Sequence, residues 1–383
     1  MINVNQQALL ELLKASLFGT EPSFPIDTDW NAVLQEAEDQ TVVALAAPAI
    51  PDSEAEKWEK RIRYNKMRFM QILTEQTNLV RVFHDAGIPL VILKGCAAAM
   101  YYPEPVRRTM GDIDFIVPPE QFDDARHLME ENGYQFDHDL GDDRDYCYYK
   151  NKVSFELHHR YSDIDWDIEP IILNGMAHPE ICEIYNNKFP ALPTEINGLV
   201  LLDHVRHHLY GGLGIRQIID WMMFVHVVLD DKTWETRFAP LARDAGLETF
   251  AITMTKMCRL WFGLPDTITW CDSANIETAQ QLLETVFDFG NFGIKTPYVY
   301  RPMENLSMGV HKQGFFRFLQ TTGIANWKAC QKHRFLRPFA WLYQLFRFTG
   351  RGFKALFRGE HLAKDAAKGT KKSDFYERLG LNR

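Results

Sequence analysis

The hydrophobic pattern changes along the chain from helical spacing to strand alternation and back. Apolar residues recur at helical spacing over residues 5–86, where a long predicted helix ends at Gly87 and Pro89, and again over residues 195–290. Residues 88–160 instead show short apolar and alternating runs, which are typical of strands. We therefore expect an α+β fold, in which a small mixed sheet with helices is flanked by N- and C-terminal helical regions. The predicted parts are an N-terminal helical region (1–87), an α/β core (88–170), a helical domain (171–310) and a basic amphipathic C-terminal tail (311–383).

Two acidic residues lie on one face of a predicted strand. Successive side chains of a strand point to opposite faces, so Asp112 and Asp114 should project together from the apolar run that follows Gly111. Two like charges this close repel each other, and their burial is costly unless a cation lies between them. The pair predicts a site for Mg²⁺, or Mn²⁺ in its place, because Mg²⁺ takes carboxylate oxygens together with substrate phosphates. A solvated strand end behind a turn is the alternative.

A lysine–glycine turn precedes this strand. Lys94 and Gly95 end an apolar run and lead into a short helix-forming stretch that starts with Cys96. A strand–turn–helix unit offers free backbone N–H groups, to which phosphate binds favourably. We therefore expect the phosphates of a nucleotide beside this turn.

A third acidic residue lies in another alternating segment, residues 152–159. Glu156 and His158 share its polar face. If this strand lies beside the first, three carboxylates converge. Two of them can bridge a pair of divalent ions, and the third can complete one metal's shell and orient or deprotonate an attacking hydroxyl.

Together these motifs resemble a known family. The relevant runs are Leu93-Lys94-Gly95, Tyr101-Tyr-Pro103, Arg108-Thr-Met-Gly-Asp112-Ile-Asp114 and Glu156-Leu-His158. They are similar to the uncharacterised nucleotidyltransferase family within the DNA polymerase beta-like superfamily, over residues 28 to about 270. The resemblance implies a nucleotidyltransferase-like α/β core.

The resemblance also implies roles for individual residues. The implied catalytic and metal-binding residues are Asp112, Asp114 and Glu156, and the implied nucleotide-binding residues are Lys94, Gly95, Cys96, Arg108 and His158. The superfamily's turn usually ends in Gly-Ser, whose hydroxyl helps to hold the triphosphate. Cys96 takes the place of that serine here, so the hydroxyl contact is missing.

Arg108 has two possible roles. It lies in the predicted loop between the turn and the Asp strand, four residues before Asp112, where it suits phosphate binding. The alternative is a surface arginine that pairs with Glu104 or Asp112.

The implied reaction transfers a nucleoside monophosphate from a nucleoside triphosphate to a hydroxyl acceptor and releases pyrophosphate. We expect a small-molecule acceptor ahead of a protein side chain or an RNA end, because the acidic body argues against broad nucleic-acid binding. The alternative is a catalytically inactive nucleotide-binding or regulatory protein that keeps the fold. The missing serine hydroxyl supports it, and the clustering of three carboxylates argues against it.

Bulk composition is typical of a cytoplasmic globular protein. Of the 383 residues, 46% are hydrophobic and 24% charged, which argues against disorder and against a membrane class. The six cysteines contain no Cys-x-x-Cys pair, so we expect reduced thiols rather than a zinc site or disulfides. There is no recognisable signal peptide, and no apolar run is long enough to predict a transmembrane segment.

One later segment carries three histidines. His204 and His208 have the i, i+4 spacing that can chelate a metal on a helix, but His-Glu-x-x-His is absent, so we favour solvated or core histidines over zinc. Arg216 and Asp220 have the spacing of an intrahelical ion pair.

The C-terminal tail reverses the charge of the rest of the chain. Residues 311–383 hold 16 Lys or Arg and 4 Asp or Glu, although the whole chain carries a net charge of −9. Within the tail, residues 335–348 place apolar residues at helical spacing with arginines between them. This segment can pack on the acidic body, which we favour, lie on an anionic membrane, or contact nucleic acid.

Overall fold

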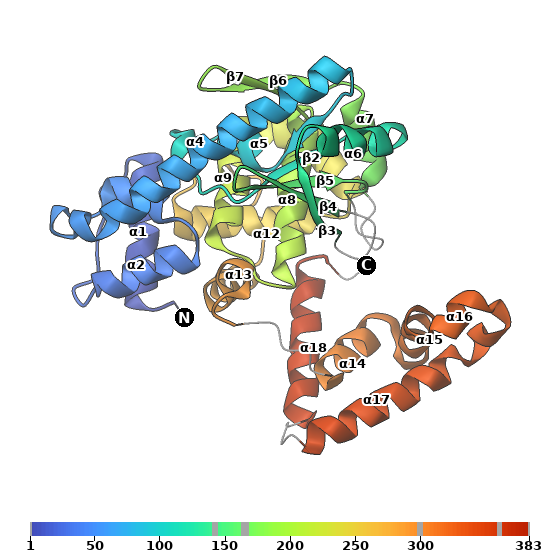
Figure 1. Ribbon diagram of the computed structural model, residues 1–383. Coiled ribbons are helices and arrows are strands. Elements are labelled where there is room, and N and C mark those ends of the chain that lie inside the picture. The colour runs from blue at the N-terminus through green and yellow to red at the C-terminus, as the bar shows by residue number, and fades with distance from the viewer. Residues whose placement is uncertain (1, 140–144, 162–167, 297–301, 358–361, 382–383) are drawn as a thin grey trace. The chain divides into compact units, whose positions relative to one another are not determined.

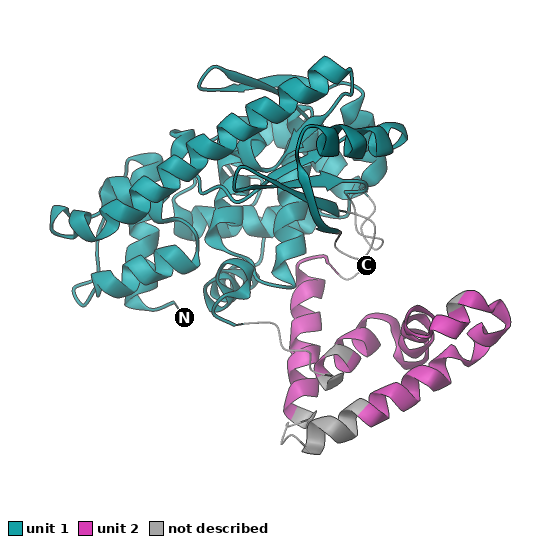
Figure 2. Cartoon of the chain, viewed as in Figure 1, with its two compact units in different colours: residues 1–297 teal, residues 298–383 magenta. Residues whose placement is uncertain are grey.

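The computed structural model describes residues 2–139, 145–161, 168–296, 302–357 and 362–381. The chain divides into two compact units, Met1–Pro297 and Tyr298–Arg383 (Figure 2). The second unit begins close to the predicted start of the basic tail. The finer division of residues 1–297 into three parts stays a prediction.

The first unit contains most of the helices and all the strands of the described residues (Figure 1). Its strands are β1 (Val91–Leu93), β2 (Ile113–Ile116), β3 (Gln135–Asp139), β4 (Asp145–Lys150), β5 (Val153–His158), β6 (Glu180–Ile184) and β7 (Asn187–Ala191). Its α-helices are α1 (Val4–Phe18), α2 (Trp30–Asp39), α3 (Val43–Ala46), α4 (Ala55–Ala86), α5 (Gly95–Ala99), α6 (Phe122–Glu131), α7 (Glu169–Met176), α8 (Thr194–Leu209), α9 (Ile215–Val228), α10 (Asp231–Thr233), α11 (Ala239–Asp244), α12 (Glu248–Met257) and α13 (Ile276–Phe289).

The seven strands form one mixed sheet in the order β3-β4-β5-β2-β1-β7-β6. The central strand β2 is antiparallel to β1 and parallel to β5. This arrangement confirms the predicted α+β fold with a mixed sheet between helical segments. It also brings the two predicted acidic strands side by side, although some forty residues separate them in sequence.

Helix α4 covers one face of the sheet. It ends at Gly87, whose φ of +72° is readily adopted by glycine. Its apolar side, which includes Phe69 and Phe83, packs with Phe115 of β2 and Phe155 of β5 in a single core. Because alternate residues of β2 are committed to this core, the aspartates between them face the other side of the strand.

Residues 171–310, predicted as a helical domain, also contain two strands. Strands β6 and β7 form a hairpin, and Ala191 of β7 pairs with Ile92 of β1. The two turn residues, Tyr185 and Asn186, both have positive φ, as a tight two-residue hairpin requires. Tyrosine is an unusual residue at such a position, so little in the amino-acid sequence signals this turn.

The second unit consists of helices. They are α14 (Pro302–Gln313), α15 (Phe315–Asn326), α16 (Lys328–Lys332), α17 (Ala340–Phe357) and α18 (Leu362–Arg378). Helices α14 and α18 pack together, as do α15 and α17. The basic segment is therefore a folded helical unit rather than an isolated amphipathic tail. No described helix is long and apolar enough to cross a membrane.

Candidate active site

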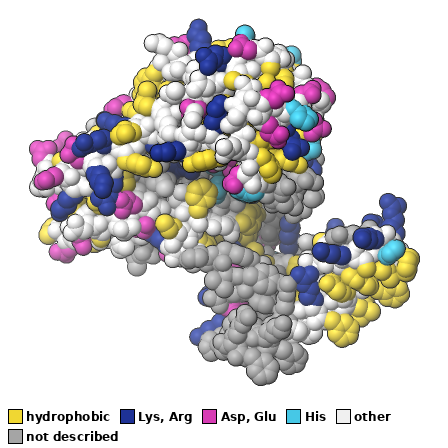
Figure 3. Space-filling model, viewed as in Figure 1, with side chains coloured by type: hydrophobic (Ala, Val, Ile, Leu, Met, Phe, Trp, Pro, Cys, Tyr) yellow, Lys and Arg dark blue, Asp and Glu magenta, His cyan; other side chains and the backbone are white. Residues whose placement is uncertain are grey.

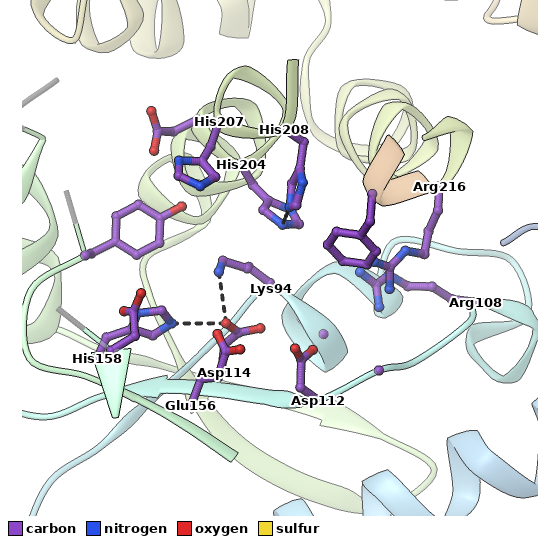
Figure 4. Close-up of a pocket in the computed structure, with 16 residues that line it drawn as sticks. Lys94, Arg108, Asp112, Asp114, Glu156, His158, His204, His207, His208 and Arg216 are labelled. Carbon is purple, nitrogen blue, oxygen red and sulfur yellow. Dashed lines mark hydrogen bonds and ion pairs between the residues drawn. The ribbon is translucent and has the colours of Figure 1, made fainter. Parts of the chain in front are cut away.

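A pocket opens on the face of the sheet away from α4 (Figure 4). The parallel register of β2 and β5 places Asp114 directly beside Glu156. The carboxylates of Asp114 and Glu156 and the imidazole of His158 offer ligand atoms that all lie within 4.8 Å of one another. Asp112 lines the same pocket next to Asp114 but is not part of this three-residue group. Sequence alternation therefore led to residues that the fold does bring together.

Asp114 lies between two basic side chains. Its Oδ1 is 2.9 Å from Nζ of Lys94 and 3.0 Å from Nε2 of His158. Burial by itself would raise the pKa of Asp114, but Lys94 and His158 outweigh this effect and hold the pKa well below its usual value. Asp114 is therefore an anion whose charge is already balanced by protein cations.

His158 joins two carboxylates. Its other ring nitrogen, Nδ1, makes a short hydrogen bond with Asp145, the residue opposite it on β4. Burial would lower the pKa of His158, but the hydrogen bonds with Asp114 and Asp145 raise it to about 9. At neutral pH His158 is therefore an imidazolium that donates to both carboxylates.

For Glu156 and Asp112 the nearby cations do not outweigh burial and the neighbouring negative charges. Burial, followed by the charges of Asp114 and Asp112, raises the pKa of Glu156 to about 8. Burial and the charge of Asp114 also raise the pKa of Asp112. Of the three predicted metal-binding carboxylates, Asp114 is thus ionised and paired, whereas the ionised forms of Asp112 and Glu156 are disfavoured until a cation binds.

The turn before α5 has an uncommon backbone conformation. Lys94 has φ +49° and ψ −131°, and Gly95 has φ +32°. A positive φ is costly for a lysine, and here it accompanies a side chain that reaches back to Asp114. Both residues line the pocket, as the resemblance implies for a nucleotide-binding turn.

Cys96 is fully buried, and its thiol packs in the sheet core rather than in the pocket. Burial raises the pKa of this thiol to about 12. The side chain of Cys96 therefore cannot replace the serine hydroxyl of the superfamily, and any contact with a nucleotide must come from its backbone.

Arg108 is paired inside the protein. Its Nε and a terminal nitrogen each lie 2.7 Å from an oxygen of Asp220, and Arg108 is only 3% exposed. The alternative of a surface pair with Glu104 or Asp112 is wrong. The predicted intrahelical pair of Arg216 and Asp220 is also wrong, because Asp220 is bound by Arg108 and by the Tyr102 hydroxyl at 2.6 Å.

The second arginine of the pocket, Arg216, is held differently. Its guanidinium donates to the backbone oxygen of Thr109 at 3.1 Å, and its buried Nε lacks a hydrogen-bond partner. Burial, and then the charge of nearby Arg108, lowers the pKa of Arg216. An anion bound in the pocket would give Nε of Arg216 a hydrogen-bond partner and would stabilise the charged form of Arg216.

The three histidines of α8 line the pocket opposite the carboxylates (Figure 4). Nε2 of His204 lies 2.9 Å from Nε2 of His208, which requires one ring to donate and the other to accept. Burial, and then the charge of His207, lowers the pKa of His208 to about 3, and the pKa of His204 is also well below its usual value. Among the described residues these histidines belong to no three-ligand group.

Comparison with known proteins gives the family. The model of the uncharacterised nucleotidyltransferase family matches residues 27–263, which is more than half of the chain. The chain belongs to this family. It is therefore an enzyme of the nucleotidyltransferase class, as the resemblance implied.

Solved structures with some similarity are also nucleotidyltransferase-like. A crystal structure of ANT(2'')-Ia in complex with adenylyl-2''-tobramycin is 15% identical and covers 45% of this chain and 98% of its own, with a TM-score of 0.33. An antigenic nucleotidyltransferase-like protein from Paracoccidioides brasiliensis is 13% identical and covers 52% of this chain and 94% of its own, again with a TM-score of 0.33. These values are too low to carry an argument about activity. No curated protein matches the chain significantly.

The donor atoms of this nucleotidyltransferase suit a divalent cation. The carboxylates of Asp112, Asp114 and Glu156 supply oxygen ligands of the kind that Mg²⁺ or Mn²⁺ accepts, whereas His158, both of whose nitrogens donate to carboxylates, holds Asp114 in place. The ammonium of Lys94 against Asp114 shows that this position is stabilised by positive charge.

Sequence reasoning missed several residues of the pocket. They are Asp145, Tyr161, Asp203 and Phe292. Arg216 also lines the pocket, although the sequence predicted only an ion pair for it. One signal was present: Asp145 lies within residues 88–160, whose short apolar and alternating runs predict strands. Its position opposite His158 depends on the register of β4 and β5.

Proposed function

We propose that this nucleotidyltransferase uses Mg²⁺ or Mn²⁺ to move a nucleoside monophosphate from a nucleoside triphosphate to a hydroxylated small molecule. The observation that carries the proposal is the approach of the Asp114 and Glu156 carboxylates to within 4.8 Å of each other, in the pocket that also contains Asp112 and the Lys94-Gly95 turn. Asp112, Asp114 and Glu156 are the proposed metal-binding and catalytic residues. When bound, a divalent cation would neutralise the charge that develops on the transferred phosphoryl group.

The triphosphate is assigned to the end of the pocket near Gly95. The backbone of Lys94 and Gly95 and the guanidinium of Arg216 are the proposed contacts, because the buried Nε of Arg216 lacks a partner. Arg108 remains a predicted nucleotide-binding residue, but its nitrogens are engaged by Asp220, by the Met110 sulfur at 3.0 Å and, more distantly, by a backbone oxygen. We therefore give Arg108 a positioning role beside the triphosphate.

The acceptor is assigned to the histidine side of the pocket. Neutral imidazoles accept hydrogen bonds from hydroxyl groups, and His204 and His208 lie across the cavity from the carboxylates. Glu156, on the carboxylate side, is the proposed group that orients the acceptor hydroxyl and receives its proton. This division of the pocket favours a small hydroxylated acceptor.

The test begins with binding. Each of the four nucleoside triphosphates is added with Mg²⁺, with Mn²⁺ and with neither, and thermal unfolding is recorded. A ligand at about 100 times its dissociation constant should add roughly 2.7 kcal/mol of stability. The preferred triphosphate is then incubated with a panel of hydroxylated small molecules, and pyrophosphate is measured.

The matched variants separate catalysis from general charge effects. Glu156→Gln should abolish pyrophosphate release. Asp123→Asn, which changes a carboxylate that is 85% exposed on α6, should leave release unchanged. Equal activity in the two variants would refute the proposed site.

The second candidate is a nucleotide-binding protein without turnover. The burial of Cys96, which removes the superfamily's hydroxyl contact, is the observation that favours it. Metal-dependent triphosphate binding without pyrophosphate release for any acceptor would support this candidate. The same result would still be consistent with the proposed metal site.

A further inference from the structure

The C-terminal unit exposes an uncommon number of aromatic side chains. Among the described residues of this unit the exposed large hydrophobic side chains are Phe315 (43%), Phe316 (69%), Phe335 (72%), Phe339 (55%) and Phe346 (74%). Surface hydrophobic residues are ordinary when scattered, but a contiguous group marks an interaction site. In Figure 3 hydrophobic side chains gather on one side of this unit.

Helix α17 has two apolar sides, and only one of them is covered. Ala340 and Phe348 are buried against α15, where Gly323 allows close approach because a Cβ there would lie 2.1 Å from the Ala340 oxygen. Away from this contact Phe346 of α17 is exposed, and so are Phe335 and Phe339 of the short 3-10 helix Arg334–Phe339 that leads into α17. We call Phe335, Phe339 and Phe346 the phenylalanine stripe.

The charge around the stripe is of one sign. Residues 311–357 contain nine Lys or Arg and no Asp or Glu. Six of these basic residues lie within four positions of the stripe or of Phe315 and Phe316, and all of them except Arg347 are exposed: Lys312, Arg317, Lys332, Arg334, Arg337 and Arg347. A segment of 47 residues without a single acid, in a chain that is acidic overall, is a surface suited to an anionic partner.

We propose that the C-terminal unit docks on an anionic lipid surface, with the phenylalanine stripe in the acyl boundary and the arginines at the phosphate headgroups. Apolar burial combined with attraction to anionic lipids is the physical basis of interfacial binding. A second copy of the chain fits less well, because two strongly basic segments would repel each other. Single-stranded nucleic acid fits less well too, because Leu342, which lies between Phe339 and Phe346 in the sequence and is half-buried, cannot stack on a base.

The test uses the full-length chain in flotation with vesicles of phosphatidylcholine, alone or mixed with phosphatidylserine. The protein should float with the mixed vesicles only, and added salt should weaken this binding. The combined variant Phe335→Ser, Phe339→Ser and Phe346→Ser should lower the partition coefficient at least about tenfold. A tenfold change in partitioning requires less free energy than the full burial of a single Phe side chain contributes.

Two further variants complete the design. Arg334→Glu with Arg337→Glu tests the charge without touching the stripe and should also reduce flotation. The matched control is Tyr64→Ser with Ile181→Ser, which removes two side chains of the first unit that are each 67% exposed and should leave flotation unchanged. Far-ultraviolet circular dichroism shows whether each variant is folded, and Phe346→Ser alone serves if the combined variant is not.

Several results would overturn the proposal. One is the absence of flotation with phosphatidylserine vesicles. Another is flotation that the charge variant abolishes while the stripe variant does not, because the phenylalanines would then stay out of the lipid. Displacement from vesicles by a single-stranded oligonucleotide, or a dimer in light scattering that the stripe variant dissociates, would assign the surface to nucleic acid or to a second copy.

Discussion

Replacing either partner of the Arg108–Asp220 pair should cost stability. Both residues are at most 3% exposed, and two contacts of 2.7 Å join the guanidinium to the carboxylate. Truncation of one partner leaves the other as a buried charge without compensation, which costs about 3–5 kcal/mol. Asp220→Ala should show this loss most clearly, because it also leaves the Tyr102 hydroxyl without its 2.6 Å partner.

The double variant distinguishes a structural pair from a site for phosphate. Arg108→Met combined with Asp220→Leu removes both charges and fills the space with apolar side chains. Such replacements of buried ion pairs are often neutral or stabilising. The double variant should therefore be far more stable than Asp220→Ala alone.

The assay is equilibrium unfolding in urea, followed by tryptophan fluorescence. A changed midpoint with an unchanged slope reports a loss of stability. The matched control is Arg63→Met, which breaks a pair with Glu59 whose side chains are about 65% exposed, and should cost at most about 1 kcal/mol. The reasoning is refuted if Arg108→Met is as stable as the control yet selectively loses affinity for triphosphate over nucleoside, because Arg108 would then be a phosphate ligand.

Three further predictions concern the pocket. Arg216→Met should weaken binding of a triphosphate more than binding of its nucleoside in parallel titrations, because one charge-assisted contact contributes about 1.5–3 kcal/mol; an equal loss for both ligands would give Arg216 a purely structural role. Asp112→Asn should keep or raise the metal-free melting temperature, because burial and the neighbouring charge of Asp114 raise the pKa of Asp112. Asp114→Asn should lower the melting temperature, because it leaves Lys94 and the protonated His158 without the anion of Asp114. The opposite order of the two melting temperatures would contradict the charge balance described above. Glu156→Gln should stabilise the metal-free protein by up to about 3 kcal/mol at pH 7. The folded-state pKa of Glu156 is raised from 4.5 to about 8, so the wild type loses stability as pH rises between these values, and the gain of the variant should vanish below pH 4.5; a gain that does not change with pH would exclude this cause.

The chemistry of the pocket was largely readable in the sequence. Alternation is a local property of a strand, so Asp112 and Asp114 could be placed on one face of β2, and Glu156 and His158 on one face of β5, without knowledge of the fold. The glycine that ends α4 and the turn at Gly95 are local signals of the same kind. These residues were enough to indicate the family.

The tertiary structure decided which groups meet. The hairpin β6–β7 joins the sheet through a single residue pairing with β1, which is far away in sequence. The turn of this hairpin lacks the residue types that usually form tight turns. Asp220 lies 112 residues from Arg108, and only the packing of α9 beside α5 makes it the arginine's partner instead of Arg216.

The same holds for charge. Lys94 and His158 set the ionisation of Asp114, and they meet it only once β1, β2 and β5 are in register. Local patterns record which way a side chain points relative to its own backbone. Desolvation and pairing depend on what the rest of the chain places opposite it, which no local pattern contains.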